Sequence, residues 1–257
     1  GTKTKKYKKT SKKSKRPKKS KRPKKSKRPK KSRRPKKFKE ILDVPFSKYK
    51  SKGTRATLGN IEFHYQGYRN IKNFVRVMNF DVNYDNPILH LFARENKVYY
   101  ISIPDLRFDK KFNIVIINLN TTEENHANIA FVNNINNTIE FYEPHGYRKN
   151  KNSEIAGIKG IYHKKIKVLT DIFRRLLPNH SFIDAISMNK KTSFQTELDP
   201  DEHTGFCITW CILFIHYRLL NPDILLSRLM KHIDKIMTTT KLLKYAKHVE
   251  DTIKQKI

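Results

Sequence analysis

The separation of charge into two unlike parts is the feature that most constrains how this sequence can fold. Residues 1–37 contain 23 lysines and arginines and no acidic residue. From Ser14 the hexamer Ser-Lys-Arg-Pro-Lys-Lys occurs three times, and a fourth copy from Ser32 has Arg33 in place of lysine. A segment almost without apolar side chains cannot bury enough surface to fold, and its regularly spaced prolines block a helix. We therefore expect residues 1–37 to be a disordered polybasic tail and residues 38–257 to form the folded domain.

The tail carries most of the charge of the chain, which predicts a polyanionic partner. The formal net charge is +33, and the 33 basic and 23 acidic residues outside the tail leave the domain with +10. Lysine and arginine neutralise phosphates and release counterions, so we expect sequence-independent, salt-sensitive binding to nucleic acid. A nuclear-import role is compatible with that binding, and a tail that only aids solubility is the alternative. The residues expected to contact nucleic acid are Lys15, Arg16, Lys18, Lys21, Arg22, Lys24, Lys27, Arg28, Lys30, Arg33, Arg34 and Lys36.

The remaining composition is that of an ordinary globular domain in a reducing compartment. About 220 residues are enough to bury one core. The longest apolar run, Phe206–Tyr217, is too short to span a bilayer, and no apolar segment of a secretory signal follows the basic N-terminal region. The two cysteines form neither a disulfide framework nor a metal-binding pattern. We expect a chain that is neither secreted nor bound to a membrane.

Hydrophobic periodicity predicts an α+β domain, with a small mixed β-sheet packed on a central helix. Two short strands, His126–Val132 and Thr138–Tyr142, flank an asparagine-rich turn and predict a β-hairpin. Apolar spacing predicts a helix over His163–Leu177, stopped by Pro178, and an apolar helix over Thr204–Leu220. Further strands are expected over Ile61–Tyr68, Lys97–Ile103, Asn113–Asn118 and Ser181–Ser187. Further helices are expected over Asp223–Ile236 and Thr240–Lys254, Phe38–Leu58 is expected to be a connecting segment, and Ile71–Asn79 fits either state.

Three residues at the ends of these elements form a candidate catalytic set. His126 opens one strand of the hairpin and Glu143 follows the other, so the hairpin brings the two side chains together. A carboxylate that accepts from one imidazole nitrogen fixes the tautomer and leaves the other nitrogen as a base. Cys207 lies where the apolar helix begins, and the backbone N–H groups and dipole of a helix N-terminus favour a thiolate. A thiolate beside an oriented histidine is an activated nucleophile.

The same residues give the sequence a resemblance to a known family. His126, the 17-residue step to Glu143 within Tyr-Glu-Pro-His-Gly, and Cys207 within Cys-x-x-Trp-Cys resemble the adenain family of adenoviral proteases. More broadly they resemble the ubiquitin-like-protein (SUMO-specific) protease clan. The strings Gly-Phe-Cys-x-x-Trp and Leu-Leu-Asn-Pro-Asp also resemble protease homologues of large double-stranded DNA viruses. The resemblance covers residues 120–220 and implies a papain-like fold whose central helix carries the nucleophile.

The resemblance also implies an oxyanion residue. The clan uses a glutamine shortly before the cysteine, and its amide acts with the Cys207 backbone N–H on the tetrahedral oxyanion. Gln195 is the candidate, although it lies 12 residues upstream rather than six or seven. The sequence departs from the clan at two further positions, with Ala127 in place of tryptophan and Ile208 in place of glycine. Both departures change the walls of the cleft rather than the catalytic set.

Other residues near the motifs have alternative interpretations. Cys211, one helical turn after Cys207, is expected to pack in the core. His145 and His203 are rival bases, although a histidine in an exposed loop is the commoner state. The acidic loop Asp199–Glu202, with His203, has donors for a metal, but a solvated loop is the favoured interpretation. We expect no metal site and no cofactor, with DNA as a polyanionic activator the one addition considered.

These observations together predict a cysteine endopeptidase. The resemblance implies cleavage of virion precursor proteins after small residues such as glycine, while the tail holds the enzyme on DNA. It also implies a location in the virion and in the nucleus or cytoplasmic viral factory of a host cell. Two alternatives stay open: a deSUMOylase or deubiquitinase that acts on ubiquitin-like conjugates, and a catalytically silent DNA-binding virion protein.

Overall fold

The chain divides into two units, Gly1–Lys36 and Lys37–Ile257, and all described residues belong to the second. The computed structural model describes residues 37–41, 67–95, 97–122, 125–144, 156–188 and 206–255, with the backbone alone over 156–160. The tail residues expected to contact nucleic acid lie outside this part of the chain. So do most of the predicted strand Ile61–Tyr68 and of the connecting segment Phe38–Leu58.

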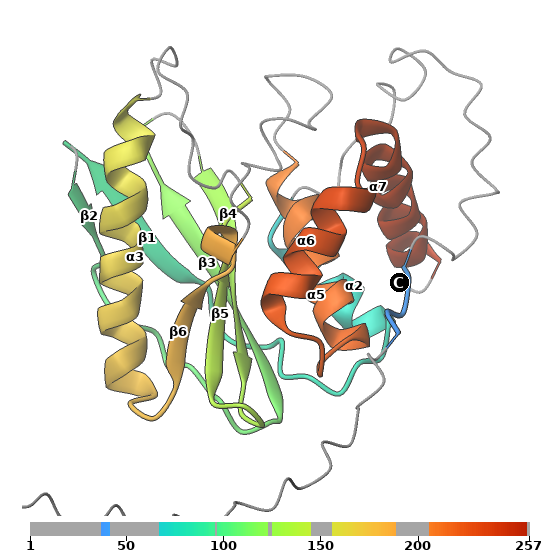
Figure 1. The fold of residues 1–257 in the computed structure, drawn as a ribbon. Coiled ribbons are helices and arrows are strands. Elements are labelled where there is room, and N and C mark those ends of the chain that lie inside the picture. The colour runs from blue at the N-terminus through green and yellow to red at the C-terminus, as the bar shows by residue number, and fades with distance from the viewer. Residues whose placement is uncertain are drawn as a thin grey trace, which may run out of the picture. The chain divides into compact units, whose positions relative to one another are not determined.

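A six-stranded mixed sheet forms the middle layer, in the order β2-β1-β3-β4-β5-β6 (Figure 1). β1 pairs with β3, and β5 with β6, in parallel, while the other neighbours are antiparallel. β4 and β5 form the predicted hairpin, with Ile129 opposite Tyr142. The strands are β1 (Leu89–Arg94), β2 (Lys97–Tyr99), β3 (Phe112–Asn120), β4 (Asn125–Asn133), β5 (Thr138–Tyr142) and β6 (Ser181–Asp184).

Helices cover both faces of this sheet. α3 lies on one face, and α5 lies on the other together with α2, α6 and α7 (Figure 1). No helix in the described ranges combines the length and the apolar character needed to cross a membrane. The helices are α2 (Arg69–Val77), α3 (Ala156–Leu176), α5 (Cys207–Leu220), α6 (Leu226–Ile236) and α7 (Thr239–Lys254), with a short 3₁₀ helix η2 (Ile186–Met188) after β6.

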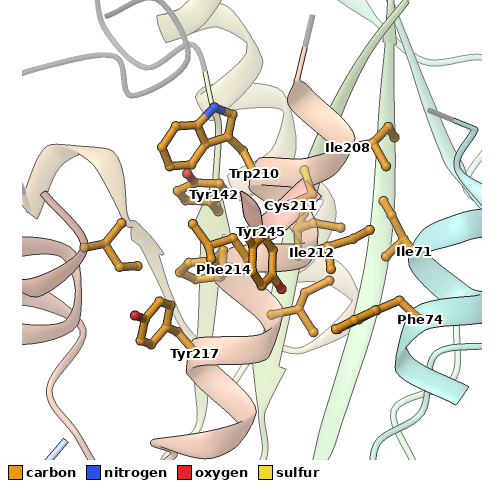
Figure 2. Packing of buried hydrophobic residues seen from close by; sticks show 14 of the residues in the cluster. Ile71, Phe74, Tyr142, Ile208, Trp210, Cys211, Ile212, Phe214, Tyr217 and Tyr245 are labelled. Atoms are coloured by element: carbon orange, nitrogen blue, oxygen red, sulfur yellow. The ribbon is translucent and has the colours of Figure 1, made fainter. Parts of the chain in front are cut away.

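α5 is the most deeply buried of the described helices. Every residue from Ile208 to Arg218 is buried, because the helix carries large apolar side chains on all sides. Figure 2 shows α5 between Tyr142 of β5 and Phe74 of α2. The rings of Tyr142 and Phe214 stack with centroids 4.5 Å apart. The sheet on one side and α2, α6 and α7 around it together keep this helix from water.

An ion pair anchors the C-terminal half of α5 to β5. Arg218 donates from Nε and Nη2 to the carboxylate of Glu140, at 2.6 and 2.9 Å, and both side chains are buried. Its Nη1 donates to the backbone carbonyls of Asn221 and Ile224 at 2.9 and 2.8 Å. Burial raises the pKa of Glu140, and the nearby guanidinium lowers it in part. The pairing supplies the hydrogen bonds that a buried arginine needs.

The predicted mixed sheet packed on a central helix is present, but the architecture is larger than expected. α3 covers a second face, so the sheet is enclosed on both sides. β1 was not predicted, since it contains no β-branched residue. The ambiguous segment Ile71–Asn79 is helical as far as Val77, because Ile71, Phe74 and Val75 are buried at helical spacing. The strand predicted over Ser181–Ser187 ends at Asp184, where η2 follows.

We predict that stability falls in mild acid because of His216. Its imidazole is buried, lies 3.1 Å from the Tyr245 hydroxyl, and has its pKa lowered from 6.5 to about 3, first by burial and then by His248. Between these pH values the unfolded chain binds the proton and the native state does not, so the free energy of unfolding falls as pH falls. At pH 5 the loss is about 2 kcal/mol.

Denaturant unfolding measured from pH 7 to pH 4.5 checks this prediction. His216→Gln should reduce the slope of stability against pH, and His163→Gln, at an exposed position, controls for the loss of one histidine. Parallel slopes in wild type and His216→Gln would show that His216 does not cause the acid sensitivity.

Candidate active site

His126 and Glu143 meet at one end of the hairpin. His126 is the second residue of β4, and Glu143 directly follows β5, so the antiparallel pairing puts both at the same edge of the sheet. Nε2 of His126 forms a hydrogen bond with Oε1 of Glu143. The two residues are 6% and 2% exposed. The structure therefore brings together the two side chains that the sequence places at the hairpin ends.

The surroundings of His126 favour its neutral form. Burial, and then the positive charge of Lys165, lowers the pKa of His126 well below its usual range. The imidazole is therefore neutral near pH 7 and able to accept a proton. Because Nε2 is directed to Glu143, Nδ1 is the ring nitrogen for proton exchange with a thiol.

Cys207 is the first residue of α5 and is partly exposed. Neither Cys207 nor Cys211 is in a disulfide. The residue before it, Phe206, has no side-chain acceptor with which to cap the helix. The positive end of the helix dipole thus acts on the Cys207 sulfur, where it favours the thiolate.

The register of α5 against the hairpin shows where Cys207 lies. Residues about one turn apart on α5 contact positions two residues apart along the hairpin, starting from the strand ends that carry His126. The contacts are the Cys211 thiol on the Ala127 carbonyl at 3.6 Å, Phe214 on Tyr142, and Arg218 on Glu140. Cys207 precedes Cys211 by one helical turn, about 6 Å along the axis. This register puts Cys207 level with the first residues of β4, at the edge where His126 and Glu143 lie.

Tyr68 gives an independent indication of the surroundings of Cys207. Burial raises the pKa of Tyr68, and the nearby Cys207 and Cys211 side chains raise it further. Its hydroxyl donates a hydrogen bond to Asn118 Oδ1, and Asn118 lies opposite Ala127 in the sheet. The first turn of α5 therefore lies close to the ends of β3 and β4.

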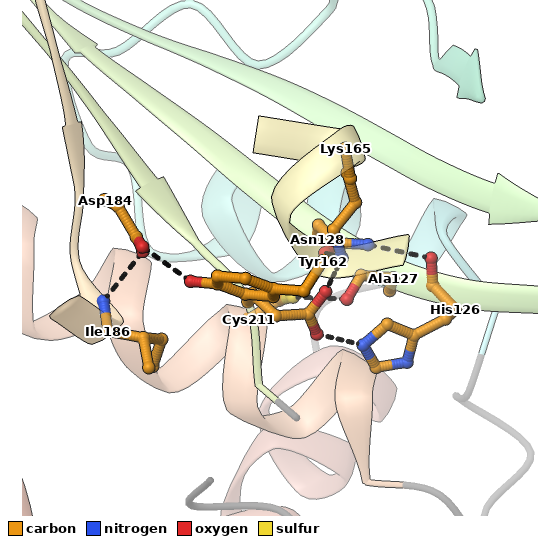
Figure 3. A network of polar contacts seen from close by, with 9 residues as sticks. His126, Ala127, Asn128, Tyr162, Lys165, Asp184, Ile186 and Cys211 are labelled. Carbon is orange, nitrogen blue, oxygen red and sulfur yellow. Dashed lines mark hydrogen bonds and ion pairs between the residues drawn. The ribbon is translucent and has the colours of Figure 1, made fainter. Parts of the chain in front are cut away.

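Lys165 is a site residue that the sequence did not suggest. Lys165 belongs to α3, and its side chain extends to the sheet. There its Nζ forms an ion pair with Oε2 of Glu143 and donates to Asn128 Oδ1 at 3.0 Å (Figure 3). Burial lowers the pKa of Lys165 from its usual value, and the Asp184 carboxylate raises it in part. The ion pair with Glu143 favours the ammonium form. The sequence around Lys165, His-Lys-Lys-Ile-Lys, is typical of a solvent-exposed face of a helix. The sequence signal that could have identified Lys165 as buried is its helical spacing from apolar residues. The buried residues of α3 include Tyr162, Lys165, Leu169 and Ile172, three or four positions apart.

The other predicted site residues fall outside the described part of the chain. These are the oxyanion candidate Gln195, the rival bases His145 and His203, and the acidic loop Asp199–Glu202. Cys211 is fully buried, in agreement with its expected packing role. Within the described ranges, no group of three or more His, Cys, Asp or Glu side chains is arranged to hold a metal ion.

Comparison with known proteins gives structural neighbours only. No protein-family model and no curated protein matches the sequence. Similar solved structures include ChlaDub1 from Chlamydia trachomatis, with TM-score 0.35, 13% identity, and 56% of this chain and 61% of that chain covered. They also include the Chlamydia trachomatis effector Cdu1 bound to ubiquitin, with TM-score 0.35, 12% identity, and 56% and 62% coverage. A second structure of the effector ChlaDUB1 has TM-score 0.37, 11% identity, and 72% and 69% coverage.

The alignment thus spans about three fifths of the first of these proteins.

We predict that the two cysteines differ sharply in reactivity. Cys207 is partly exposed at a helix N-terminus, while Cys211 is inaccessible and its pKa is raised well above the usual range by burial. Each unit of pKa elevation removes about nine tenths of the thiolate, so Cys207 should react with iodoacetamide at least about tenfold faster at pH 7.5. Mass spectrometry of the two modified sites over time measures both rates. Equal rates in the folded protein would contradict the assigned environments.

Proposed function

We propose that this chain is a cysteine protease in which Cys207 is the nucleophile, His126 the base, and Glu143 the residue that orients the base. The observation that carries the proposal is the hydrogen bond from His126 to Glu143 at the edge of the sheet where α5 presents Cys207. A thiol, a neutral imidazole and a carboxylate in this order are the parts needed to activate a thiolate nucleophile.

The proposed reaction has two halves. Nδ1 of His126 takes the proton of the Cys207 thiol, and the thiolate attacks the carbonyl carbon of the scissile bond. The Cys207 backbone N–H, with Gln195 as the second donor implied by the resemblance, stabilises the oxyanion. The imidazolium then gives its proton to the leaving amine, which leaves a thioester on Cys207. Water, deprotonated by His126, attacks the thioester and releases the acid and the thiol.

The substrates proposed follow from the family resemblance. Cleavage after small residues such as glycine fits virion precursor proteins, and it also fits the C-terminal tails of ubiquitin-like proteins. We favour precursor processing, because the polybasic tail suits an enzyme held on a packaged genome. The corresponding location is the virion, with the nucleus or viral factory of the host cell during assembly. No cofactor is proposed, except for DNA as a polyanionic activator.

Substitution of Cys207 tests the proposed activity. Cys207→Ala should lower turnover by about 10⁴-fold or more, because the nucleophile is lost. Cys211→Ala is the matched control, since it removes a buried thiol four residues away on the same helix. The assay compares fluorogenic ubiquitin, fluorogenic SUMO and virion precursor proteins.

The three functions give different results in this assay. Precursor cleavage alone supports the favoured function, and cleavage of a ubiquitin-like substrate alone supports the alternative enzyme. A wild-type chain that cuts none of them, or a Cys207→Ala variant as active as wild type, would exclude the proposed protease.

The tail makes a separate, measurable prediction. DNA affinity of the full chain should fall steeply with salt, with a slope in log–log form of about −0.9 for each phosphate neutralised. A chain that begins at Phe38 lacks 23 basic residues and should show a much shallower slope. Fluorescence anisotropy with a labelled duplex across a salt series measures both slopes. Equal slopes would show that the tail does not contact the phosphates.

A further inference from the structure

We infer that Lys165 is a positioning residue, which holds one oxygen of the Glu143 carboxylate so that the other is directed at His126. This inference rests on the proposed function, because it assigns a role within the same site. Oε1 of Glu143 contacts His126, and Oε2 contacts the Lys165 ammonium. A carboxylate held at both oxygens cannot rotate away from the imidazole, so Lys165 sets the direction of the base.

Asn128 connects Lys165 to the backbone of His126. Its Oδ1 accepts from Lys165 Nζ at 3.0 Å, and its Nδ2 donates to the backbone carbonyl of His126 at 3.1 Å. Figure 3 shows Lys165, Asn128 and His126 joined by these contacts. Lys165 is thus linked to His126 by two routes, through the carboxylate that orients the ring and through the strand that carries it.

The lysine has little access to solvent. It is 2% exposed, and its Nζ lies over the rings of Phe141 and Tyr162, 5.6 and 5.7 Å from their centroids. The Tyr162 hydroxyl donates to Asp184 at 2.6 Å, and Asp184 also accepts from the Ile186 backbone N–H at 3.1 Å. The ammonium therefore has a fixed position between α3 and the sheet.

A contribution to stability alone does not account for a lysine here. A buried ion pair is often no more stabilising than apolar side chains of similar volume, because both charges lose their hydration. Apolar residues occupy the neighbouring buried positions of α3, Leu169 and Ile172. A charge is kept at the one position that reaches the proposed catalytic carboxylate.

The charge of Lys165 also affects the proton affinity of His126. With Lys165 paired to Glu143, the carboxylate is already neutralised and the resting imidazole stays uncharged. Without Lys165, Glu143 would stabilise the imidazolium instead, and the pKa of His126 would rise. The titratable groups that face Lys165 are Glu143 and His126 at the strand ends, Tyr162 on its own helix, Asp184 at the end of β6, and Cys211 of α5.

The experiment follows the ring of His126 by NMR during a pH titration, with the signal assigned from His126→Gln, and measures turnover in parallel. Lys165→Met removes the charge and keeps the volume. Its His126 midpoint should rise by about 1 to 3 pH units, and turnover at pH 7 should fall at least about tenfold. Lys165→Arg keeps the charge and should hold the midpoint near that of wild type.

Arg218→Met is the matched control. It removes the other buried cation paired to a carboxylate of this hairpin, Glu140, which β5 directs to the α5 face. This variant should unfold at lower temperature and leave the His126 midpoint unchanged. A shift of the midpoint in Arg218→Met as large as in Lys165→Met would mean that general loosening, not Lys165, moves it.

A double variant keeps the inference falsifiable if Lys165→Met does not fold. Lys165→Met with Glu143→Gln leaves no buried charge unpaired, and its turnover should equal that of Glu143→Gln alone if Lys165 acts through Glu143. A lower turnover in the double variant, or an unchanged midpoint in folded Lys165→Met, would overturn the inference. Failure of the proposed function would give a different result. The turnover of Cys207→Ala would then equal that of wild type, while the His126 midpoint in Lys165→Met would still show whether Lys165 affects His126.

Discussion

The burial of α5 is the constraint on which the rest of the structure depends. A helix that is apolar on every side must be covered on every side, and here the sheet covers one side while α2, α6 and α7 cover the others. Its lateral position is then set by contacts with the hairpin, above all the Tyr142–Phe214 stack and the Arg218–Glu140 ion pair. Because these contacts define the register, they also define where the N-terminus of the helix, and so Cys207, must lie.

The opposite face of the sheet contributes the other half of the candidate site. Side chains along β5 point alternately to the two faces of the sheet, so Glu140 contacts α5 and Phe141 packs against α3. The hairpin therefore packs against helices on both of its faces. Glu143 continues this pattern and meets Lys165 of α3, while Cys207 comes from α5. The site therefore forms at the edge where both layers end, and its geometry requires that both helices pack correctly on the sheet.

The extent to which the sequence predicted this arrangement varied with the range of the interaction involved. The β4–β5 hairpin and α5 were predictable because turn residues and an unbroken apolar run are local signals. The hairpin alone was enough to predict that His126 and Glu143 lie close together. β1 was missed because it has few strand-forming residues and is held by its pairing with β3, a segment more than twenty residues away. Lys165 was missed because its environment comes from β4 and β5, which contribute nothing to the local pattern of α3.

The sequence by itself determined which thiol, imidazole and carboxylate form the proposed catalytic set, the strands and helix at whose ends they lie, and the charge that distinguishes tail from domain. Only the tertiary structure decided that the carboxylate is shared with a buried lysine, which ring nitrogen faces it, and that Cys207 lies level with the start of β4. The physical reason is that side-chain type and local periodicity depend only on residues that are close together in the sequence. Burial, register and charge pairing arise only when elements distant in sequence exclude water together.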